Sequence, residues 1–194
     1  WYDVWSATPD HLLVVVGDVS GRGLHAAAVM ASLRFATRAY AALGEGPTGI
    51  LTKLCGLLDI EHDGHLATMV CAEVDLAHRT MTLANAGHPK PIFIDADGGR
   101  FIDMPIGPPI GVVAAAEYRS VTIDVPADAT FLAFTDGLFE RRGELLDIGL
   151  ERVLAAATEQ ALPLNDLVGR LYAQLTGDAA ADDVAILAVR WHGA

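Results

Sequence analysis

The middle of the chain, from Leu66 to Thr135, carries one strand signal after another and no helical period. Each signal is a short run of β-branched or apolar residues bounded by turn residues. The runs are Leu66–Val74, Thr80–Asn85, Pro91–Ile94, Phe101–Met104, Tyr118–Val125 and Thr130–Thr135. Most of the connections are short, and a parallel crossover needs a dozen or more residues. This region therefore predicts antiparallel sheets.

Helix signals lie on both sides of this region, and strand signals lie near both ends of the chain. The helix signals are Leu24–Leu43, Pro47–Ile60, Leu150–Gln160 and Leu164–Leu175, and the outer strand signals are Trp1–Trp5, His11–Gly17 and Asp183–Trp191. This order lacks the βαβ alternation of a doubly wound sheet. The sequence therefore predicts an α+β fold with helices packed outside the sheets.

The first helix signal is amphipathic, with apolar residues at spacings of three and four. These apolar positions are Leu24, Ala27, Ala28, Ala31, Phe35 and Ala39. Arg34 and Arg38 fall on the other side of the helix. The pattern favours packing of the apolar side on a sheet.

Length and composition favour one folded domain, which we expect to span residues 1–194. The chain is 52% apolar and 20% charged, as globular proteins are. Its net charge of −12 argues against binding to nucleic acid or to anionic membrane surfaces. The longest apolar run, Pro105–Ala116, is broken by Pro and Gly, so no membrane span is expected.

The two cysteines, Cys55 and Cys71, sit among apolar neighbours. We expect both to be reduced core residues rather than a disulfide, which favours a cytoplasmic location. The chain opens at Trp1 inside a strand signal, with no methionine. We therefore expect a fragment of a longer, multidomain protein.

Three aspartates stand at the ends of predicted strands. Asp18 follows His11–Gly17, Asp136 follows Thr130–Thr135, and Asp182 precedes the last strand. Carboxylates held by rigid strands can converge on one hard cation, and Mg²⁺ and Mn²⁺ prefer such oxygen ligands. A single aspartate after a strand is more often a turn or cap residue. Spacing alone does not choose between Asp182 and its neighbour Asp183.

Other phosphate and metal motifs are absent from the sequence. Residues 17–23 are rich in glycine but lack the Gly-Lys-Ser/Thr ending of a P-loop. Position 26 is Ala, so the dinucleotide-binding glycine pattern is incomplete. No Cys or His pair has the spacing of a dedicated zinc site.

The histidines offer weaker signals. His88 lies in a compact turn, Asn85–Pro89, where it is either a general acid or substrate contact, or a turn residue that caps nearby backbone. The turn interpretation is the more common one. We expect His25, His62 and His65 to lie on the surface.

Six motifs in series resemble those of bacterial type 2C-like serine/threonine phosphatases of the SpoIIE/RsbU branch. They are Gly-Asp-Val-Ser-Gly-Arg-Gly-Leu at 17–24, Leu-Ala-Thr-Met-Val at 66–70, Asn-Ala-Gly-His-Pro at 85–89, Pro-Ile-Gly at 109–111, Phe-Thr-Asp-Gly-Leu-Phe-Glu at 134–140 and Asp-Asp-Val-Ala-Ile-Leu at 182–187. Each motif alone is weak, but together they cover nearly the whole chain in the order of the family.

The resemblance implies an αββα sandwich of two antiparallel sheets flanked by helix pairs, and two Mn²⁺ or Mg²⁺ ions. By motif position, Asp18 would bridge both ions and the Val19 carbonyl would bind one. Asp136 and Asp182 would complete the second site, which favours Asp182 over Asp183. Paired ions of this kind acidify a bridging water for in-line attack on a phosphoryl group.

The sequence also departs from the family pattern. The family's Gly-Gly-Asp motif, and with it the first strand, would precede Trp1. Asp3 corresponds to a later aspartate of the motif, so we do not assign it the role of that upstream aspartate. Ala185 replaces a common Thr, and Arg22 replaces the usual His. Ser20 stands where eukaryotic relatives carry a histidine taken as a general acid, so the general acid is unassigned.

The resemblance implies a substrate and partners as well. The expected substrate is a phosphoserine or phosphothreonine on an anti-anti-sigma (STAS-type) protein in a partner-switching pathway that controls a sigma factor. A regulatory sensor domain in the same chain and a homodimer are the expected partners. The alternatives are a phosphatase fold that serves as a regulatory or binding module with little turnover, and a phosphatase for small phosphoesters.

Overall fold

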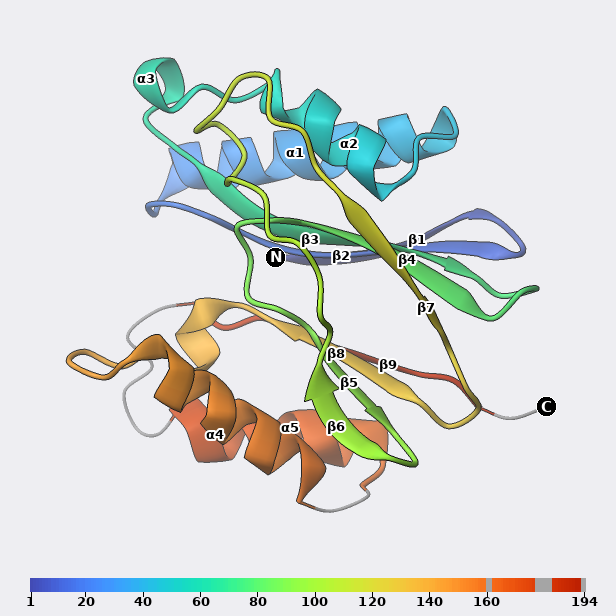
Figure 1. The fold of residues 1–194 in the computed structure, drawn as a ribbon. Coiled ribbons are helices and arrows are strands. Elements are labelled where there is room, and N and C mark those ends of the chain that lie inside the picture. The colour runs from blue at the N-terminus through green and yellow to red at the C-terminus, as the bar shows by residue number, and fades with distance from the viewer. Residues whose placement is uncertain (160–161, 177–182, 193–194) are drawn as a thin grey trace. The chain divides into compact units, whose positions relative to one another are not determined.

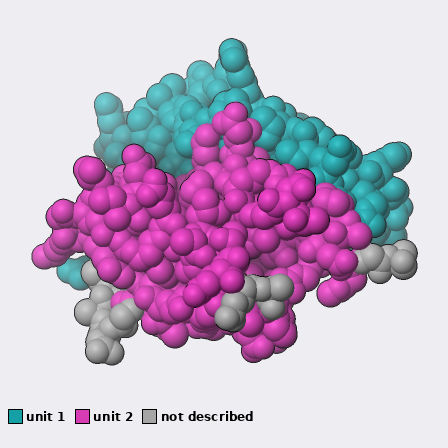
Figure 2. All heavy atoms as spheres, turned by 60° about the horizontal axis from the view of Figure 1, so that its bottom comes forward, with its two compact units in different colours: residues 1–88, 104–125 teal, residues 89–103, 126–194 magenta. Residues whose placement is uncertain are grey.

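The computed structural model describes residues 1–159, 162–176 and 183–192. The chain divides into two compact units, residues 1–88 with 104–125 and residues 89–103 with 126–194 (Figure 2). Each unit holds one antiparallel sheet and a pair of long helices (Figure 1). The predicted α+β class, with antiparallel sheets flanked by helix pairs, is therefore confirmed.

The sheet of the first unit has five strands in the order β1-β2-β3-β4-β7 (Figure 1). They are β1 (Tyr2–Thr8), β2 (His11–Val19), β3 (Ala67–Asp75), β4 (Thr80–Ala86) and β7 (Ser120–Asp124). Every neighbouring pair is antiparallel. Residues 13–17 of β2 are buried. This strand therefore runs through the core and emerges at Asp18.

Three helices belong to this unit: α1 (Leu24–Ala42), α2 (Pro47–Cys55) and α3 (Ile60–Asp63). Ile50, Leu51 and Leu54 of α2 are fully buried in the same core cluster as the sheet residue Met69. The sequence predicted one helix over Pro47–Ile60, which is too long. The observed helix ends at Cys55 because Gly56, a poor helix former, follows it.

Periodicity favours packing of the Leu24 and Phe35 side of helix α1 on the sheet. The structure shows that the opposite side of the helix faces the sheet. Ala26, Leu33 and Thr37 are buried, whereas Leu24 and Phe35 are 88% and 67% exposed. The other residues of the predicted apolar side, Ala27, Ala28, Ala31 and Ala39, also lie at least partly in solvent. Because this helix is rich in apolar residues all round, periodicity alone does not decide which side faces the core.

The orientation of α1 follows from the buried carboxylate of Asp3 on β1. Arg38 donates to both carboxylate oxygens of Asp3 at 2.6 Å, and Arg34 donates to Oδ1 at 3.3 Å. Burial raises the pKa of Asp3, but the hydrogen bonds and charges of the two arginines outweigh it and lower this pKa overall. A buried carboxylate needs such partners. The two arginines therefore turn toward the sheet.

The second unit holds a four-stranded antiparallel sheet in the order β6-β5-β8-β9 (Figure 1). The strands are β5 (Ile92–Asp95), β6 (Gly98–Phe101), β8 (Thr130–Phe134) and β9 (Ile186–Arg190). A 3₁₀ turn, η1 (Asp136–Leu138), follows β8, and the helices are α4 (Leu146–Thr158) and α5 (Leu164–Thr176). Phe134, Val153 and Leu171 join sheet and helices in one buried cluster.

Both cysteines are free and buried, as the sequence predicted. Tyr118 donates to the Pro108 carbonyl at 2.9 Å, so the Cys55 thiol donates to the Tyr118 oxygen at 3.0 Å. Burial raises the pKa of the Cys71 thiol. Within the described ranges, no helix is long and apolar enough to cross a membrane.

Candidate functional site

Asp18 lies at the end of the buried run of β2, opposite Thr68 of β3, and is half-buried. The residue before it must be glycine. A Cβ on Gly17 would lie 2.5 Å from the Trp1 ring and 2.8 Å from the Thr68 carbonyl oxygen. Close approach of two neighbouring segments thus fixes the backbone from which the Asp18 carboxylate projects.

The Val19 carbonyl points away from β3. The Ser20 N–H donates to the Leu66 carbonyl at 2.9 Å. The Val19 C=O belongs to the same peptide unit, and in a trans peptide the two groups point in opposite directions. On the other edge of β2, β1 pairs as far as Gly17, which exchanges hydrogen bonds of 2.7 and 3.0 Å with Trp1. The Val19 carbonyl oxygen is thus directed away from the sheet pairing at Leu66, as a metal ligand would require.

The turn after Val19 is held by the residues that lead into β3. Ser20 Oγ accepts a hydrogen bond from the Leu66 N–H at 2.9 Å. The Ser20 carbonyl oxygen lies 2.6 Å from Nδ1 of His65. Gly21 and Gly23 then adopt φ values of +89° and +93°, which favour glycine. These two glycines reverse the chain so that α1 begins at Leu24.

Asp136 lies two residues after β8 in the second unit and is half-buried. Its Oδ1 accepts a hydrogen bond from the Gly137 N–H at 2.9 Å. Its carbonyl accepts hydrogen bonds from the N–H groups of Phe139 and Glu140 at 2.9 and 2.8 Å. The 3₁₀ turn thus orients the carboxylate through contacts with its own neighbours in sequence.

Thr135, which precedes Asp136, binds the segment that leads into β9. The Thr135 N–H donates to the Ala185 carbonyl at 3.0 Å, and the Ala185 N–H donates to Thr135 Oγ1 at 2.9 Å. The Thr135 hydroxyl in turn donates to the Asp183 carbonyl at 3.3 Å. Asp182 itself lies outside the described residues. Its neighbour in sequence, Asp183, is therefore held next to the residue that precedes Asp136.

These observations fit hard cations. Asp18 and Asp136 offer half-buried carboxylates near the ends of buried strands, and Val19 offers an outward carbonyl. Oxygen donors of this kind suit Mg²⁺ and Mn²⁺. Among residues 1–159, 162–176 and 183–192, no three His, Cys, Asp or Glu side chains gather as a cluster that could hold a metal ion.

Asn85–Pro89 is a turn, but the residue that caps it is Asn85 rather than His88. The Asn85 side chain accepts from the His88 N–H at 2.8 Å and donates to the His88 carbonyl at 2.9 Å. His88 is 2% exposed, and its Nδ1 lies 2.9 Å from Thr68 Oγ1. The structure therefore favours the turn interpretation and places His88 against Thr68, the strand partner of Asp18.

The surface prediction for the histidines is right for two and wrong for one. His25 is exposed, and the side chain of His62 is 86% exposed. His65 is half-buried, because its ring lies between the Ser20 carbonyl and the His25 ring. Its sequence context, a short polar loop, carries no signal for this contact.

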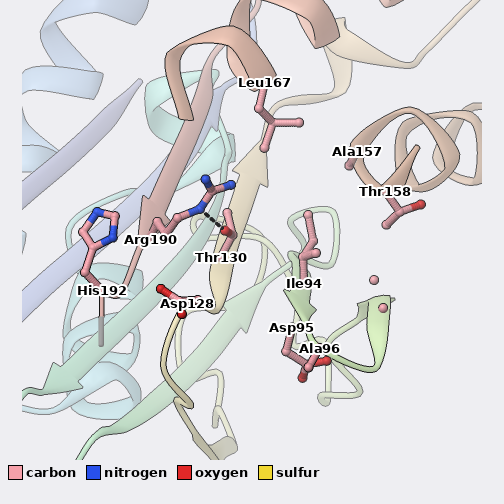
Figure 3. Close-up of a pocket in the computed structure, with 12 residues that line it drawn as sticks. Ile94, Asp95, Ala96, Asp128, Thr130, Ala157, Thr158, Leu167, Arg190 and His192 are labelled. Atoms are coloured by element: carbon pink, nitrogen blue, oxygen red, sulfur yellow. Dashed lines mark hydrogen bonds between the residues drawn. The ribbon is translucent and has the colours of Figure 1, made fainter. Parts of the chain in front are cut away.

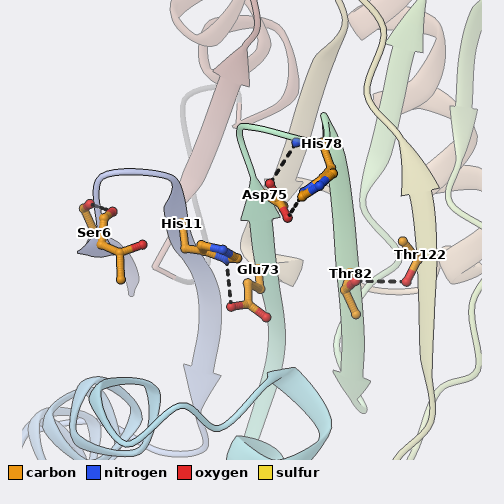
Figure 4. A network of polar contacts seen from close by, with 8 residues as sticks. Ser6, His11, Glu73, Asp75, His78, Thr82 and Thr122 are labelled. Carbon is orange, nitrogen blue, oxygen red and sulfur yellow. Dashed lines mark hydrogen bonds and ion pairs between the residues drawn. The ribbon is translucent and has the colours of Figure 1, made fainter.

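Polar side chains also gather at the opposite end of the same sheet (Figure 4). His11 begins β2 and pairs with Glu73 at 3.3 Å, and His78 contacts Asp75 at 2.7 Å. The backbone N–H and the ring of His78 lower the pKa of Asp75. These contacts join neighbours of the sheet in pairs, so we assign them no part in the site.

A cavity of about 510 Å³ lies in the second unit, at the end of β8 remote from Asp136 (Figure 3). Two of its charged lining groups, Arg190 and Asp95, already bind other residues. Arg190 donates to Thr130 at 2.8 Å, and Asp95 pairs with Arg100 at 2.8 Å. We therefore do not include the cavity in the candidate site.

The sequence of this chain matches a known protein family. The family model described as Stage II sporulation protein E (SpoIIE) matches residues 8–192. The chain is similar to the phosphoserine phosphatase RsbP of Bacillus subtilis (strain 168), with 26% identity over 132 residues, which is 66% of this chain and 33% of that protein. The chain thus spans about a third of the length of this curated relative.

Solved structures agree with this match. The structure of the RsbU and RsbW domains of Rv1364c from Mycobacterium tuberculosis is similar at a TM-score of 0.84 and 31% identity, over 100% of this chain and 55% of that one. RsbX in complex with magnesium is similar in fold at a TM-score of 0.72 and 16% identity, over 98% of this chain and 85% of that one. The fold is that of PP2C-type phosphatase domains. The chain belongs to the SpoIIE family.

Proposed function

We propose that residues 1–194 act as one metal-dependent phosphatase domain for phosphoserine and phosphothreonine in proteins. The observation that carries the proposal is that two buried strands, β2 and β8, each have a half-buried aspartate within two residues of the strand end. They do so in a chain that matches the SpoIIE family over residues 8–192. The similarity in fold to RsbX, a protein that binds magnesium, supports the dependence on metal.

The proposed ligands are the four groups named by the motifs. Asp18 would contact two ions, the Val19 carbonyl would bind one, and Asp136 and Asp182 would bind the second. When bound, Mn²⁺ or Mg²⁺ would supply Lewis acidity toward the phosphoryl group and an acidified water. The chain would fix the ligand oxygens through the Gly17 backbone, the Ser20 turn and the η1 turn.

The chain's two cysteines are not placed to act as a covalent nucleophile, which agrees with a water nucleophile. Cys71 is fully buried and burial raises its pKa, so it offers no thiolate. Cys55 is buried, and its thiol donates a hydrogen bond to the Tyr118 oxygen. Neither cysteine is therefore a candidate nucleophile.

We further propose that the substrate is a phosphorylated anti-anti-sigma (STAS-type) protein in the cytoplasm, and that the sigma factor is controlled by partner switching. The name of the relative RsbP, a phosphoserine phosphatase, supports the phosphoserine specificity. The buried free thiols support a reducing compartment. A sensor domain in the same chain, or a second protomer, would act as the regulator. The apolar outer side of α1, with Phe35 67% exposed, supports docking of such a partner.

The test is hydrolysis of p-nitrophenyl phosphate and of a phosphoserine peptide with Mn²⁺, then with EDTA. Asp136→Asn should lower kcat by more than about a hundredfold, because loss of a ligand should exceed the 10–100-fold cost of losing an outer partner. Asp103→Asn is the matched control, because Asp103 is a fully exposed residue of the same unit. Equal turnover in both variants would contradict the metal assignment. A wild type that binds a phosphoprotein without metal and does not hydrolyse it would favour a binding module.

A further inference from the structure

His65 lies where the Asp18 turn, the start of β3 and the first turn of α1 come together. Its Nδ1 is 2.6 Å from the Ser20 carbonyl oxygen, and its Nε2 is 2.9 Å from Nδ1 of His25. The two imidazole rings meet edge to face at a centroid distance of 4.8 Å. His65 thus contacts both segments that flank Gly21 and Gly23.

The direction of these hydrogen bonds follows from the groups that make them. A carbonyl oxygen only accepts, so Nδ1 of His65 must carry the proton that binds Ser20. In a neutral His65 ring, Nε2 then accepts a hydrogen bond, and Nδ1 of His25 donates to it. The first turn of α1 is thereby connected to the Ser20 carbonyl through a single imidazole.

The space around the ring is also matched to a histidine. A Cβ on Gly21 would lie 3.2 Å from Cε1 of His65. This distance is tighter than an ordinary van der Waals contact, and Gly21 has a φ of +89°. The ring therefore packs directly against the glycine backbone of the turn.

Ser20 is consequently held at three points. Its N–H donates to Leu66, its Oγ accepts from Leu66, and its carbonyl accepts from His65. The N–H bond fixes the plane of the Val19–Ser20 peptide, and the carbonyl bond fixes the next peptide plane. The first of these planes contains the Val19 carbonyl, and the second limits rotation about the Ser20 backbone, so together they fix where the Val19 oxygen points.

We propose that His65 is a positioning residue for the Asp18–Val19 end of the metal site. It would hold the Ser20 carbonyl so that the Val19 oxygen stays directed at a bound cation, and it would link this turn to α1 through His25. The inference rests on the proposed metal-dependent function. Partners that orient ligands in this way are typically worth 10–100-fold in metal affinity or activity.

The test compares His65→Asn with His65→Gln, because the amide nitrogen of Asn takes the place of Nδ1 and that of Gln takes the place of Nε2. Binding of Mn²⁺ is measured by calorimetry, and the Mn²⁺ dependence of kcat is measured separately. His65→Ala and His65→Gln should weaken Mn²⁺ binding by about tenfold or more. His65→Asn should restore most of the affinity, because it keeps the donor to Ser20.

A metal-free measurement separates positioning from general stability. Amide exchange at Ser20 should quicken in His65→Gln and stay slow in His65→Asn, whereas the two melting temperatures should agree. His62→Ala is the matched control, because His62 is an exposed histidine of the same segment. Wild-type Mn²⁺ affinity in His65→Gln, or equal losses in the Asn and Gln variants, would overturn the inference.

The variant Asp18→Asn distinguishes the proposed metal site from the proposed positioning role of His65. If Asp18→Asn abolishes Mn²⁺ binding while His65→Gln binds normally, the metal site stands and the role of His65 is wrong. If wild type and Asp18→Asn bind Mn²⁺ equally, the proposed function itself fails and the inference fails with it.

Discussion

The ends of β2 and β8 look alike in sequence but are held in different ways. In both, a buried strand delivers an aspartate next to glycine, and the carboxylate is half-buried. Asp18 is still a strand residue, and the turn after it depends on His65 and Leu66, more than 40 positions away. Asp136 lies in a 3₁₀ turn and is oriented by the N–H of the next residue.

This difference shows which contacts the orientation of each carboxylate depends on. A contact with a sequence neighbour forms with little loss of chain entropy, whereas a contact between distant residues requires the intervening loop to be ordered first. The Asp18 turn therefore depends on the tertiary structure of the first unit. The Asp136 turn depends mainly on local structure and on one clamp, Thr135 to Ala185.

The largest effect on the β2 end should come from the ion pair beside it. Asp3 pairs with Val15 across the strands and anchors α1 through Arg38. Asp3→Asn should cost roughly 1.5–3 kcal/mol of unfolding free energy at pH 7, because charged hydrogen bonds are lost. Urea unfolding of wild type and variant measures this cost.

The same pair gives a pH dependence of known sign. The pKa of Asp3 is lowered in the folded state, so its contribution is present above its unfolded pKa of about 3.9 and is lost as pH falls through the folded pKa. The difference in unfolding free energy between wild type and Asp3→Asn should therefore decrease in acid. A gap that stays constant from pH 7 to pH 3 would show that the pair does not act as an ion pair.

Gly17→Ala tests the close packing before Asp18. The new Cβ would meet the Trp1 ring and the Thr68 backbone at 2.5 and 2.8 Å, so one of them must move. We expect a loss of about 1–3 kcal/mol in unfolding free energy. Gly169→Ala in α5, where nothing lies within 4 Å, should instead stabilise by up to about 1 kcal/mol. Thermal melts of both variants should shift in opposite directions.

Thr135→Val tests the clamp at the β8 end, and its effect should be the smallest. The variant keeps the shape of the side chain but removes the acceptor for Ala185 and the donor to Asp183. We expect a loss of about 1 kcal/mol in denaturant unfolding. Stability equal to wild type would mean that the turn at Asp136 orients itself without the clamp.

The sequence predicted the fold well because its strand and turn signals are local. The strands β4 and β5 begin within one residue of the predicted runs, whereas β6 (Gly98–Phe101) begins three residues before the predicted run Phe101–Met104. The α+β class follows from the order of these elements. The positions of Asp18 and Asp136 close to strand ends were also predicted from the buried runs before them, although β2 continues through Asp18 to Val19 and β8 already ends at Phe134.

The sequence did not predict features that depend on contacts between distant residues. The side of α1 that faces the sheet is set by Asp3, more than 30 positions before Arg34 and Arg38. The burial of His65 is set by the Ser20 carbonyl, 45 positions earlier. A polar loop and an alanine-rich helix carry no local signal for either contact.

The pairing of β8 with β9 has a consequence during synthesis. Every strand of the first unit's sheet lies before residue 125, whereas Ala185, which leads into β9, comes 50 positions after its partner Thr135. Chains fold from the N-terminal side as they emerge. The nascent protein should therefore complete the Asp18 turn while the second sheet still lacks an edge strand. The Asp136 end is finished only once residues 183–190 have left the ribosome, so the two strand ends are completed at different times.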